Sequence, residues 1–362
     1  MKQLGVNYPS WMTLRQNPPM ADLPPFKKLT LEDVARQLGV SRATVSNAFN
    51  KPELLAKAKL ERIKSGALEL GYFGPDPMAR AMRRKELQEV AVVFHHDLRY
   101  ALSDPVSVEF LRGVASELDA RDLALHLIPK TGRRANTEAA FQTTADALII
   151  HDAVAPEFIP QLMAMRKPLT LVDTRIAGLA SVEIDDRLGA RNAMDYVLGK
   201  KPDQVVVLSL PLDEDARAMT EYKKENTDRS HVSTERVTGY LESLKQHAFD
   251  RSKVRWIEVL ETNTDAGGRE IVDLLGPKLQ KLRVGVVAMT DRIALSVLQE
   301  LDARAWSRPV AMVGFDDIPD AARCGLTTIR QNAYEKGVLA VRTALDRLGP
   351  VCLPTELVVR ET

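Results

Sequence analysis

From residue 89 onward, short apolar runs alternate with amphipathic stretches of helical length. A short apolar run fits a strand that is buried on both faces, and the stretch after it can form the helix that returns the chain to the next parallel strand. The alternation therefore predicts an α/β body. The expected strands are Val90–Phe94, Leu123–Ile128, Ala147–Ile150, Leu169–Val172, Val205–Leu208, Val254–Val259, Val284–Ala288 and Val310–Val313. The expected helices are Val108–Ala120, Glu157–Met165, Leu188–Leu198, Glu235–Gln246, Gly267–Leu275, Asp291–Leu301 and Tyr334–Leu348.

Eight strands interleaved with helices favour two doubly wound subdomains with a cleft between them. The strand count alone does not exclude the alternative of a single large sheet. The sequence contains no run of about eighteen apolar residues, so we expect no membrane span. The two cysteines, Cys324 and Cys352, match neither a disulfide framework nor a zinc site, and we expect reduced thiols in the cytoplasm.

Residues 29–72 show helical periodicity in short pieces and predict a three-helix module. The hydroxyl of Thr30 is placed to cap the first helix, and Asp33 lies near the positive end of that helix. Gly39 suits a turn because a left-handed backbone costs glycine nothing, and Ser41 caps the second helix. Thr30 to Asn50 is therefore expected to form a helix-turn-helix.

The second of these helices carries short or polar residues on one side, while Val45, Ala48 and Phe49 face the core. A groove-reading helix has this character. The guanidinium of Arg42 can donate two hydrogen bonds to guanine, and the amide of Asn47 can pair with adenine. The side chains suited to phosphate oxygens are those of Thr44, Ser46 and Asn50.

Charge is distributed unevenly along the chain. The segment from Lys27 to Leu87 holds 13 basic and 7 acidic residues, whereas the rest holds 37 basic and 42 acidic residues. A basic head on an acidic body fits attachment to phosphates by one part of the protein. The alternative is a merely solvated, charged helical segment.

The first 27 residues carry five prolines and no apolar signal core, so we expect a flexible extension rather than a secretory signal. A misassigned start codon is the alternative. Behind Gly74 and Pro75, residues 76–85 are expected to form a further short helix in a hinge.

The order and spacing of several motifs resemble the N-terminal signature of the LacI/GalR family of bacterial transcriptional regulators. These motifs are Thr30-Leu31-Glu32-Asp33-Val34-Ala35, Gly39-Val40-Ser41, Thr44-Val45-Ser46, Asn50, Pro52-Glu53, Leu70-Gly71-Tyr72 and Ala79-Arg80-Ala81-Met82. The resemblance implies a hinge helix in the minor groove, with Met82 as an apolar wedge between base pairs. A surface methionine in a linker is the alternative. The resulting DNA-binding set is Thr30, Ser41, Arg42, Ala43, Thr44, Ser46, Asn47, Asn50, Tyr72, Ala79, Arg80 and Met82.

This chain departs from the family pattern at three positions in its head. Asn47 stands where many relatives carry arginine, Leu60 replaces a usual arginine, and Gly74 adds a residue before the hinge. The first departure is expected to alter which base is read.

The body resembles the sensor of the same family, which is akin to periplasmic sugar-binding proteins. The motifs include Asp104-Pro105, Phe110-Leu111-Arg112-Gly113, Val182 to Asp186 with Gly189, Arg236 with Gly239-Tyr240, Thr290-Asp291, Gly314-Phe315-Asp316-Asp317, Leu326 to Gln331, Leu353-Pro354 and Arg360-Glu361. The expected organisation is a flexible extension (1–27), a helix-turn-helix domain (28–74), a hinge helix and linker (75–88), and an effector-binding and dimerisation domain (89–362). Within the last, 89–186 and 328–348 are assigned to one subdomain, and 187–327 and 349–362 to the other.

In such folds a ligand lies where strand ends of both subdomains face each other. The residues expected to bind the effector are Tyr100, Asp152, Asp173, Arg236, Asp291 and Gln331. Asp291 could instead be an ordinary capping acid, and Arg236 a surface salt-bridge partner. Thr290 replaces a usual asparagine, and residues 210–234 look like an inserted loop, so a sugar effector is an expectation from the family alone.

The resemblance implies a homodimer on a near-palindromic operator, with DNA affinity controlled by a small molecule such as a sugar or a sugar derivative. No cofactor, metal site or catalytic residue is expected, because His95 and His96 lack a ligand-spaced partner and Gly267-Gly268 lacks the lysine and threonine of a phosphate loop. A transport solute-binding protein would need a secretion signal and no DNA-binding head. A kinase or dehydrogenase fused to a regulator is the enzyme alternative.

Overall fold

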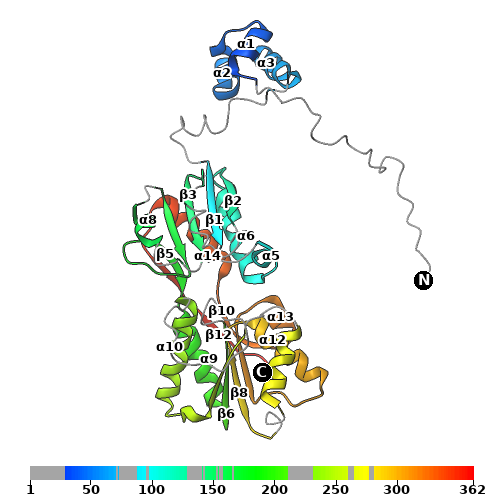
Figure 1. Ribbon diagram of the computed structural model, residues 1–362, viewed down its shortest axis with the longest axis vertical. Coiled ribbons are helices and arrows are strands. Elements are labelled where there is room, and N and C mark those ends of the chain that lie inside the picture. Colours follow the sequence, from blue (N-terminus) through cyan, green and yellow to red (C-terminus); the bar gives the residue numbers. More distant parts are fainter. Residues whose placement is uncertain are drawn as a thin grey trace, which may run out of the picture. The chain divides into compact units, whose positions relative to one another are not determined.

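The computed structural model describes residues 29–70, 72, 88–94, 98–128, 141, 143–151, 154, 158–164, 167–210, 231–259, 265–276 and 281–362. The chain divides into two compact units, Met1–Glu86 and Leu87–Thr362. The expected extension and hinge helix lie outside the described residues. The other parts of the expected fold class are confirmed: a helical head and an α/β body with two sheets (Figure 1).

The first unit contains helices α1 (Leu31–Leu38), α2 (Arg42–Asn50) and α3 (Lys57–Glu69), with a short 3-10 helix at Pro52–Leu54. As expected, Gly39 ends α1 with a left-handed backbone (φ 64°). The small core of this unit consists of Val34, Ala35, Val45, Ala48, Ile63, Ala67 and Tyr72. Leu60 packs against this core and adds to its apolar surface.

The second unit contains two six-stranded sheets, and each defines a subdomain. The first sheet has the order β11-β5-β4-β3-β1-β2 and is parallel throughout. Its strands are β1 (Glu89–Phe94), β2 (Ala124–Ile128), β3 (Ala147–His151), β4 (Leu169–Val172), β5 (Ser181–Ile184) and β11 (Val351–Leu353). The helices packed in this subdomain include α5 (Leu98–Ala101), α6 (Pro105–Asp119), α8 (Ile159–Ala164) and α14 (Ala333–Asp346).

The second sheet has the order β12-β10-β9-β8-β6-β7, and only the β10–β12 pair is antiparallel. Its strands are β6 (Gln204–Ser209), β7 (Val254–Glu258), β8 (Val284–Ala288), β9 (Ala311–Asp316), β10 (Thr327–Arg330) and β12 (Glu356–Val358). Its helices are α9 (Asp186–Gly199), α10 (His231–Gln246), α11 (Asp265–Leu275), α12 (Asp291–Ala303) and α13 (Pro319–Arg323).

The buried strands use both of their faces. In β6, Val205 and Val207 pack into a core shared with α9 and α10, whereas Val206 and Leu208 pack into a core shared with α11 and α12. Successive side chains of a strand point to opposite faces, so helices on both sides of the sheet need a strand that is apolar at every position. This explains why the sequence shows these strands as continuous apolar runs and not as an alternation of apolar and polar residues.

Between the described strands and helices of the second unit, the chain passes from one subdomain to the other between β5 and α9, between β10 and α14, and between β11 and β12. The sheet order corrects the expected subdomain boundaries. Residues 328–330 belong to β10 of the second sheet, and Val351–Leu353 form β11 of the first sheet. Both segments are short strands at a crossing point, where three or four residues give too weak a pattern to assign a sheet.

In the described part of the chain, no helix is long and apolar enough to cross a membrane. Both cysteines are exposed free thiols.

Candidate functional site

The expected DNA-reading residues lie at the start of α1 and along α2. Thr30 and Asp33 form a reciprocal capping box, in which the Asp33 amide donates to the Thr30 hydroxyl and the Asp33 carboxylate accepts from the Thr30 amide. Ser41 caps α2 by accepting from the amide of Thr44 at 3.1 Å. The two caps fix where each helix starts, and so fix which residues of α2 face the solvent.

Helix α2 turns Val45 and Ala48 into the core and leaves Arg42 and Ala43 exposed. Thr44, Ser46 and Asn47 are partly exposed. The first turn of α2 holds no acidic residue, so its free amides keep their attraction for an anion such as a phosphate. The structure thus brings Arg42, Ala43 and Asn47 onto one short helix with an accessible polar side.

Tyr72 has a different position from the other members of the expected set. Its ring is 7% exposed and packs edge-on against Phe49, with ring centroids 5.6 Å apart. Burial of the ring assigns Tyr72 a packing role in the core of the module. Ala79, Arg80, Met82 and the side chain of Asn50 lie outside the described residues.

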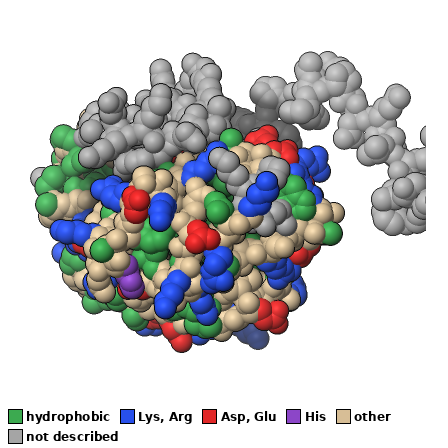
Figure 2. Space-filling model, turned by 90° about the horizontal axis from the view of Figure 1, so that it is seen from below, with side chains coloured by type: hydrophobic (Ala, Val, Ile, Leu, Met, Phe, Trp, Pro, Cys, Tyr) green, Lys and Arg blue, Asp and Glu red, His purple; other side chains and the backbone are tan. Residues whose placement is uncertain are grey.

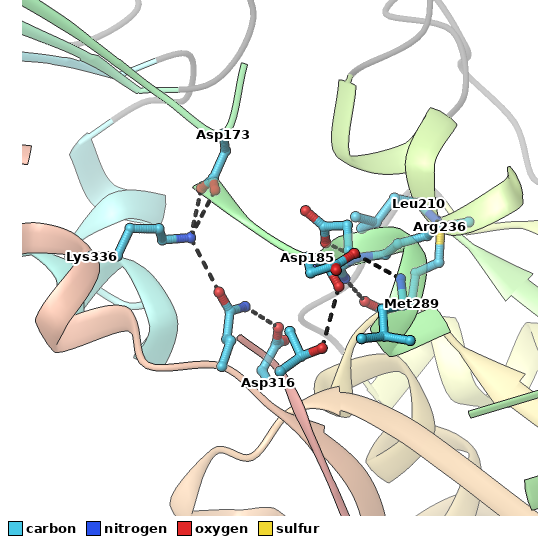
Figure 3. Close-up of polar contacts among 11 residues, drawn as sticks. Asp173, Asp185, Leu210, Arg236, Met289, Asp316 and Lys336 are labelled. Atoms are coloured by element: carbon cyan, nitrogen blue, oxygen red, sulfur yellow. Dashed lines mark hydrogen bonds and ion pairs between the residues drawn. The ribbon is translucent and has the colours of Figure 1, made fainter. Parts of the chain in front are cut away.

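In the second unit, acidic and basic side chains meet where the strands of the two sheets end (Figure 3). Asp173 follows β4 of the first sheet, and its carboxylate accepts hydrogen bonds from the ammonium of Lys336 at 2.9 and 2.7 Å. The same ammonium donates to the amide oxygen of Gln331 at 3.1 Å. The amide nitrogen of Gln331 donates to Asp316, the last residue of β9, at 2.6 Å. We call this run of residues the Asp173–Asp316 chain.

The Asp173–Asp316 chain links the first sheet to the second through the crossover residue Gln331. Burial disfavours a charge on Asp173, but the charges of Lys336 and His151 outweigh burial and hold the pKa of Asp173 below its ordinary value. Burial raises the pKa of Asp316 well above its ordinary value, and the charge of Arg236 offsets this only in part. The two ends of the chain therefore differ: the pKa of Asp173 is lowered, and the pKa of Asp316 is raised.

The backbone is unusual at the second end of this chain. Asp316 has a φ of 121° and Asp317 a φ of 58°, and both angles are rare for residues other than glycine. Asp317 is held by Arg330 at 2.7 Å and by Arg360 at 2.5 Å, so ion pairs brace the turn after β9. Strained residues of this kind are concentrated at binding sites and switch regions.

Arg236 does not lie open toward a ligand. Its side chain is 4% exposed, its Nε donates to Asp186 at 2.7 Å, and a terminal N–H donates to the carbonyl of Met289. The guanidinium also stacks over the ring of Phe315, 3.5 Å from the centroid. Arg236 therefore joins α10 to the start of α9 and to the end of β8. The alternative of a surface salt bridge is corrected, since the pair is buried, and an effector role of Arg236 stays a prediction.

Asp291 is completely buried within the second subdomain, and its carboxylate is already occupied. It accepts from the hydroxyl of Thr328 and, at 2.9 Å, from the amide of Ile318. Burial raises its pKa to about 7. The cap of α12 is Thr290, which accepts from the amide of Ile293, so the capping alternative for Asp291 is also corrected. These contacts give Asp291 a structural role between β10 and the turn after β9.

The other expected effector residues divide into three cases. Gln331 and Asp173 are members of the Asp173–Asp316 chain, as shown above. The ring of Tyr100 lies under the guanidinium of Arg292, at 5.9 Å. Asp152 lies outside the described residues. Among the residues that the structure describes, no group of three or more His, Cys, Asp or Glu is placed to hold a metal ion.

Comparisons with known proteins follow the same division of the chain. Residues 30–74 match the family described as "Bacterial regulatory proteins, lacI family", and residues 216–362 match a "Periplasmic binding protein-like domain". The chain is 30% identical over 329 residues to an HTH-type transcriptional regulator of Mycolicibacterium smegmatis, covering 86% of this chain and 89% of the relative. The chain belongs to the LacI family of bacterial regulators.

Solved structures of the family share this fold. A LacI-family regulator from Corynebacterium glutamicum has a TM-score of 0.67 at 27% identity, covering 92% of this chain and 98% of that one. The lac repressor dimer bound to operator and the anti-inducer ONPF has a TM-score of 0.68 at 19% identity, covering 93% and 99% of the two chains. Members of this family are DNA-binding transcriptional regulators rather than enzymes or transport proteins.

Sequence reasoning about this LacI-family chain did not select Lys336 or Asp316. A signal for Lys336 was present: it interrupts the apolar stripe of α14, next to Gly337 and one turn before Ala340, which are both buried. A charged residue on the buried side of a helix requires a charged partner. No pattern in the sequence pointed to Asp173 as that partner, because the two residues lie 163 positions apart.

Proposed function

We propose that this LacI-family regulator is a repressor that binds a near-palindromic operator as a homodimer and acts in the cytoplasm, where bacterial DNA lies. Its operator affinity changes when a small molecule, such as a sugar or a sugar derivative, binds between the two subdomains of the body. The observation that carries the proposal is that two features occur in one chain. The first unit presents the polar side of helix α2 in a capped helix-turn-helix, and the second unit has two sheets that buried charged groups link. A solved neighbour of the same fold holds operator DNA and an anti-inducer together.

For DNA binding, we assign Arg42 and Asn47 to contacts with bases, and Thr44 and Ser46 to contacts with phosphates. Arg42 is exposed near the start of α2, and Asn47 lies further along the same helix. A good contact with a base edge discriminates by about 1–3 kcal/mol. Loss of such a contact removes sequence preference, whereas loss of a phosphate contact weakens all DNA equally.

For sensing, we assign Asp173, Gln331 and Asp316 to the region that binds the effector. Effector binding changes operator affinity only if the effector prefers one arrangement of the subdomains. The Asp173–Asp316 chain favours such a difference, since its two ends belong to different sheets and change separation when the subdomains move.

The test is fluorescence anisotropy of the full chain with labelled DNA from upstream of its own gene and with random DNA of the same length. We expect tighter binding of the upstream DNA, and a loss of this preference in Arg42→Ala. Asn47→Arg should select a different half-site from a random pool. Arg112→Ala, which removes an exposed arginine of α6 in the body, is the charge-matched control and should bind as the parent does. Equal binding of both DNAs by the parent protein would refute the proposal.

A further inference from the structure

The start of α6 in the first subdomain is tied to the start of α12 in the second. The carboxylate of Asp104 uses its two oxygens for different partners. Oδ2 caps α6 by accepting from the amide and the hydroxyl of Ser107, each at 2.9 Å. Oδ1 accepts from the guanidinium of Arg292 at 3.3 Å. The cap therefore leaves one oxygen for a partner in the other subdomain.

The ion pair is not isolated. Val106, two residues after Asp104, packs against the apolar core that α11 and α12 form with the second sheet. The ring of Tyr100 lies against the guanidinium of Arg292. The side chains of Asp104 and Arg292 are 10% and 20% exposed, so water screens their attraction less than that of a surface pair. We call these four residues the inter-subdomain latch.

The positive charge of Arg292 does not stabilise helix α12 itself. Arg292 is its second residue, and the amino end of a helix carries a partial positive charge that favours acidic side chains. A cation there is unfavourable for the helix by itself. The compensating charge is that of Asp104, from the other subdomain.

The latch shares no residue with the crossing segments of the chain. Figure 1 shows α5 and α6 on the same side of the second unit as α12 and α13, with α9 and α10 on the opposite side. The crossings involve residues 185, 331–332 and 354–355, and none of these belongs to the latch. Three covalent connections can act as a hinge, while a non-covalent contact beside them resists rotation of the subdomains.

We propose that the Asp104–Arg292 ion pair, supported by Val106 and Tyr100, is a latch that holds the two subdomains together and sets the open–closed balance of the sensor. The regulatory consequence rests on the proposed function: an effector bound between the subdomains works with or against this latch. A partly buried pair of ordinary strength shifts such a balance about five-fold.

The test measures subdomain separation directly in the full-length protein. Exposed Arg112 on α6 and exposed Leu274 on α11 are replaced by cysteine in a chain carrying Cys324→Ser and Cys352→Ser. Spin labels on these sites report one distance per chain when labelled protein is diluted with unlabelled protein. We expect Arg292→Gln to shift the distance distribution to longer separations, with about a five-fold rise in the open-to-closed ratio.

Two further variants separate the latch from a general loss of stability. Asp104→Asn should open the sensor equally, because asparagine caps a helix as well as aspartate does but cannot form the ion pair. The double variant should open no further than either single one. Arg304→Gln removes an arginine at the other end of α12 that pairs with Glu300 and Asp273 inside the second subdomain, and it should leave the distribution unchanged.

An unchanged distribution in Arg292→Gln, or equal opening in Arg304→Gln, overturns the latch. A double variant that opens by the sum of the two single effects overturns a direct pairing of the two side chains. The measurement uses neither DNA nor effector. A failure of the latch is thus distinguished from a failure of the proposed function, which the DNA-binding test reports.

Discussion

The side chain of Lys336 shows how much a single buried charge contributes to this protein. It is 2% exposed, and it compensates the buried carboxylate of Asp173, whose side chain is 10% exposed. A buried ion pair adds little compared with apolar residues of the same shape, but removing one partner leaves a charge without compensation. The pair is therefore costly to break and fixes the arrangement of α14 against the end of β4.

We predict that Lys336→Met destabilises the protein by about 3–5 kcal/mol, measured by urea unfolding at pH 7. The double variant Lys336→Met/Asp173→Asn should regain part of this loss, since no unpaired charge remains. Lys245→Met, at an exposed position on α10, is the matched control and should lie within about 0.5 kcal/mol of the parent. A cost for Lys336→Met as small as that of the control would show that the pair is not effectively buried.

The buried carboxyl of Asp291 predicts a pH dependence of opposite sign to that of a salt-bridged acid. Its pKa in the folded protein is about 7, whereas an unfolded aspartate titrates at about 3.9. The folded state therefore binds the extra proton, and this contribution to stability is present below about pH 3.9 and lost as pH rises through about 7.

Asp291→Asn should reduce the fall in the free energy of unfolding between pH 4 and pH 7. Asparagine keeps an oxygen for the amide of Ile318, and its NH₂ group can face the hydroxyl of Thr328, which accepts as readily as it donates. Some slope should remain, because burial raises the pKa of Asp316 in the same direction. Identical slopes in the two proteins, from urea unfolding at a series of pH values, would contradict a raised pKa for Asp291.

The sequence singled out Arg236, Asp291 and Gln331 as effector residues, but it did not predict which partners their polar groups bind. The family pattern places a residue type at a position, whereas its hydrogen-bond partners come from segments far away in sequence. Arg236 pairs with Asp186 and Asp291 with Thr328, 50 and 37 residues away. Such pairs satisfy the rule that buried polar groups need partners, but the rule does not name the partner.

At the scale of the element, helix pairs pack closely through glycine. A Cβ on Gly113 of α6 would overlap the carbonyl oxygen of Tyr334, and a Cβ on Gly337 of α14 would overlap that of Phe110. The absence of a side chain at these two positions lets the helix backbones approach each other. This contact joins α14, which carries Lys336, to the helix that starts at the latch.

We predict that Gly113→Ala destabilises the protein by about 3 kcal/mol or more, the upper end of the usual cost of overpacking. The added methyl group meets backbone that cannot move without separating the helices. Gly199→Ala is the control. Gly199 ends α9, and an added Cβ there meets nothing within 4 Å, so the change should be neutral or slightly stabilising. Thermal unfolding of both variants gives the comparison. Equal melting temperatures would show that the helices have room to adjust.

The long elements were predictable and the short ones were not. The eight expected strands are found, and most of them are buried apolar runs of four or more residues. The exceptions are β2, which carries His126, and β7, which carries Arg255, and both lie at sheet edges. The strands β5, β10, β11 and β12 were missed because three or four residues, polar in part, do not make a pattern. All four adjoin the crossings, and the expected subdomain boundaries were wrong at β10 and β11, where the pattern is weakest.

At the scale of the whole molecule, charge distribution agrees with a division of work. Exposed basic residues of the first unit lie on α2 and α3. Arg42 is on α2, and α3 carries Lys57, Lys59, Arg62 and Lys64. On the face of the second unit shown in Figure 2, Lys and Arg are mixed with Asp and Glu and form no single basic surface. A field of one sign attracts phosphates, whereas a mixed surface does not. The charge distribution therefore agrees with the proposal that the head binds DNA.

The central claim is that one chain reads DNA with its head and changes that reading with its body. The most direct measurement is selection of bound genomic fragments by the full-length protein, followed by affinity measurements on the selected fragment with sugars and sugar derivatives added one at a time. The account predicts a selected fragment with a near-palindromic site, and at least one added compound that changes the affinity for it. Recovery of fragments with no common site would contradict the account, and so would a selected site whose affinity no compound changes.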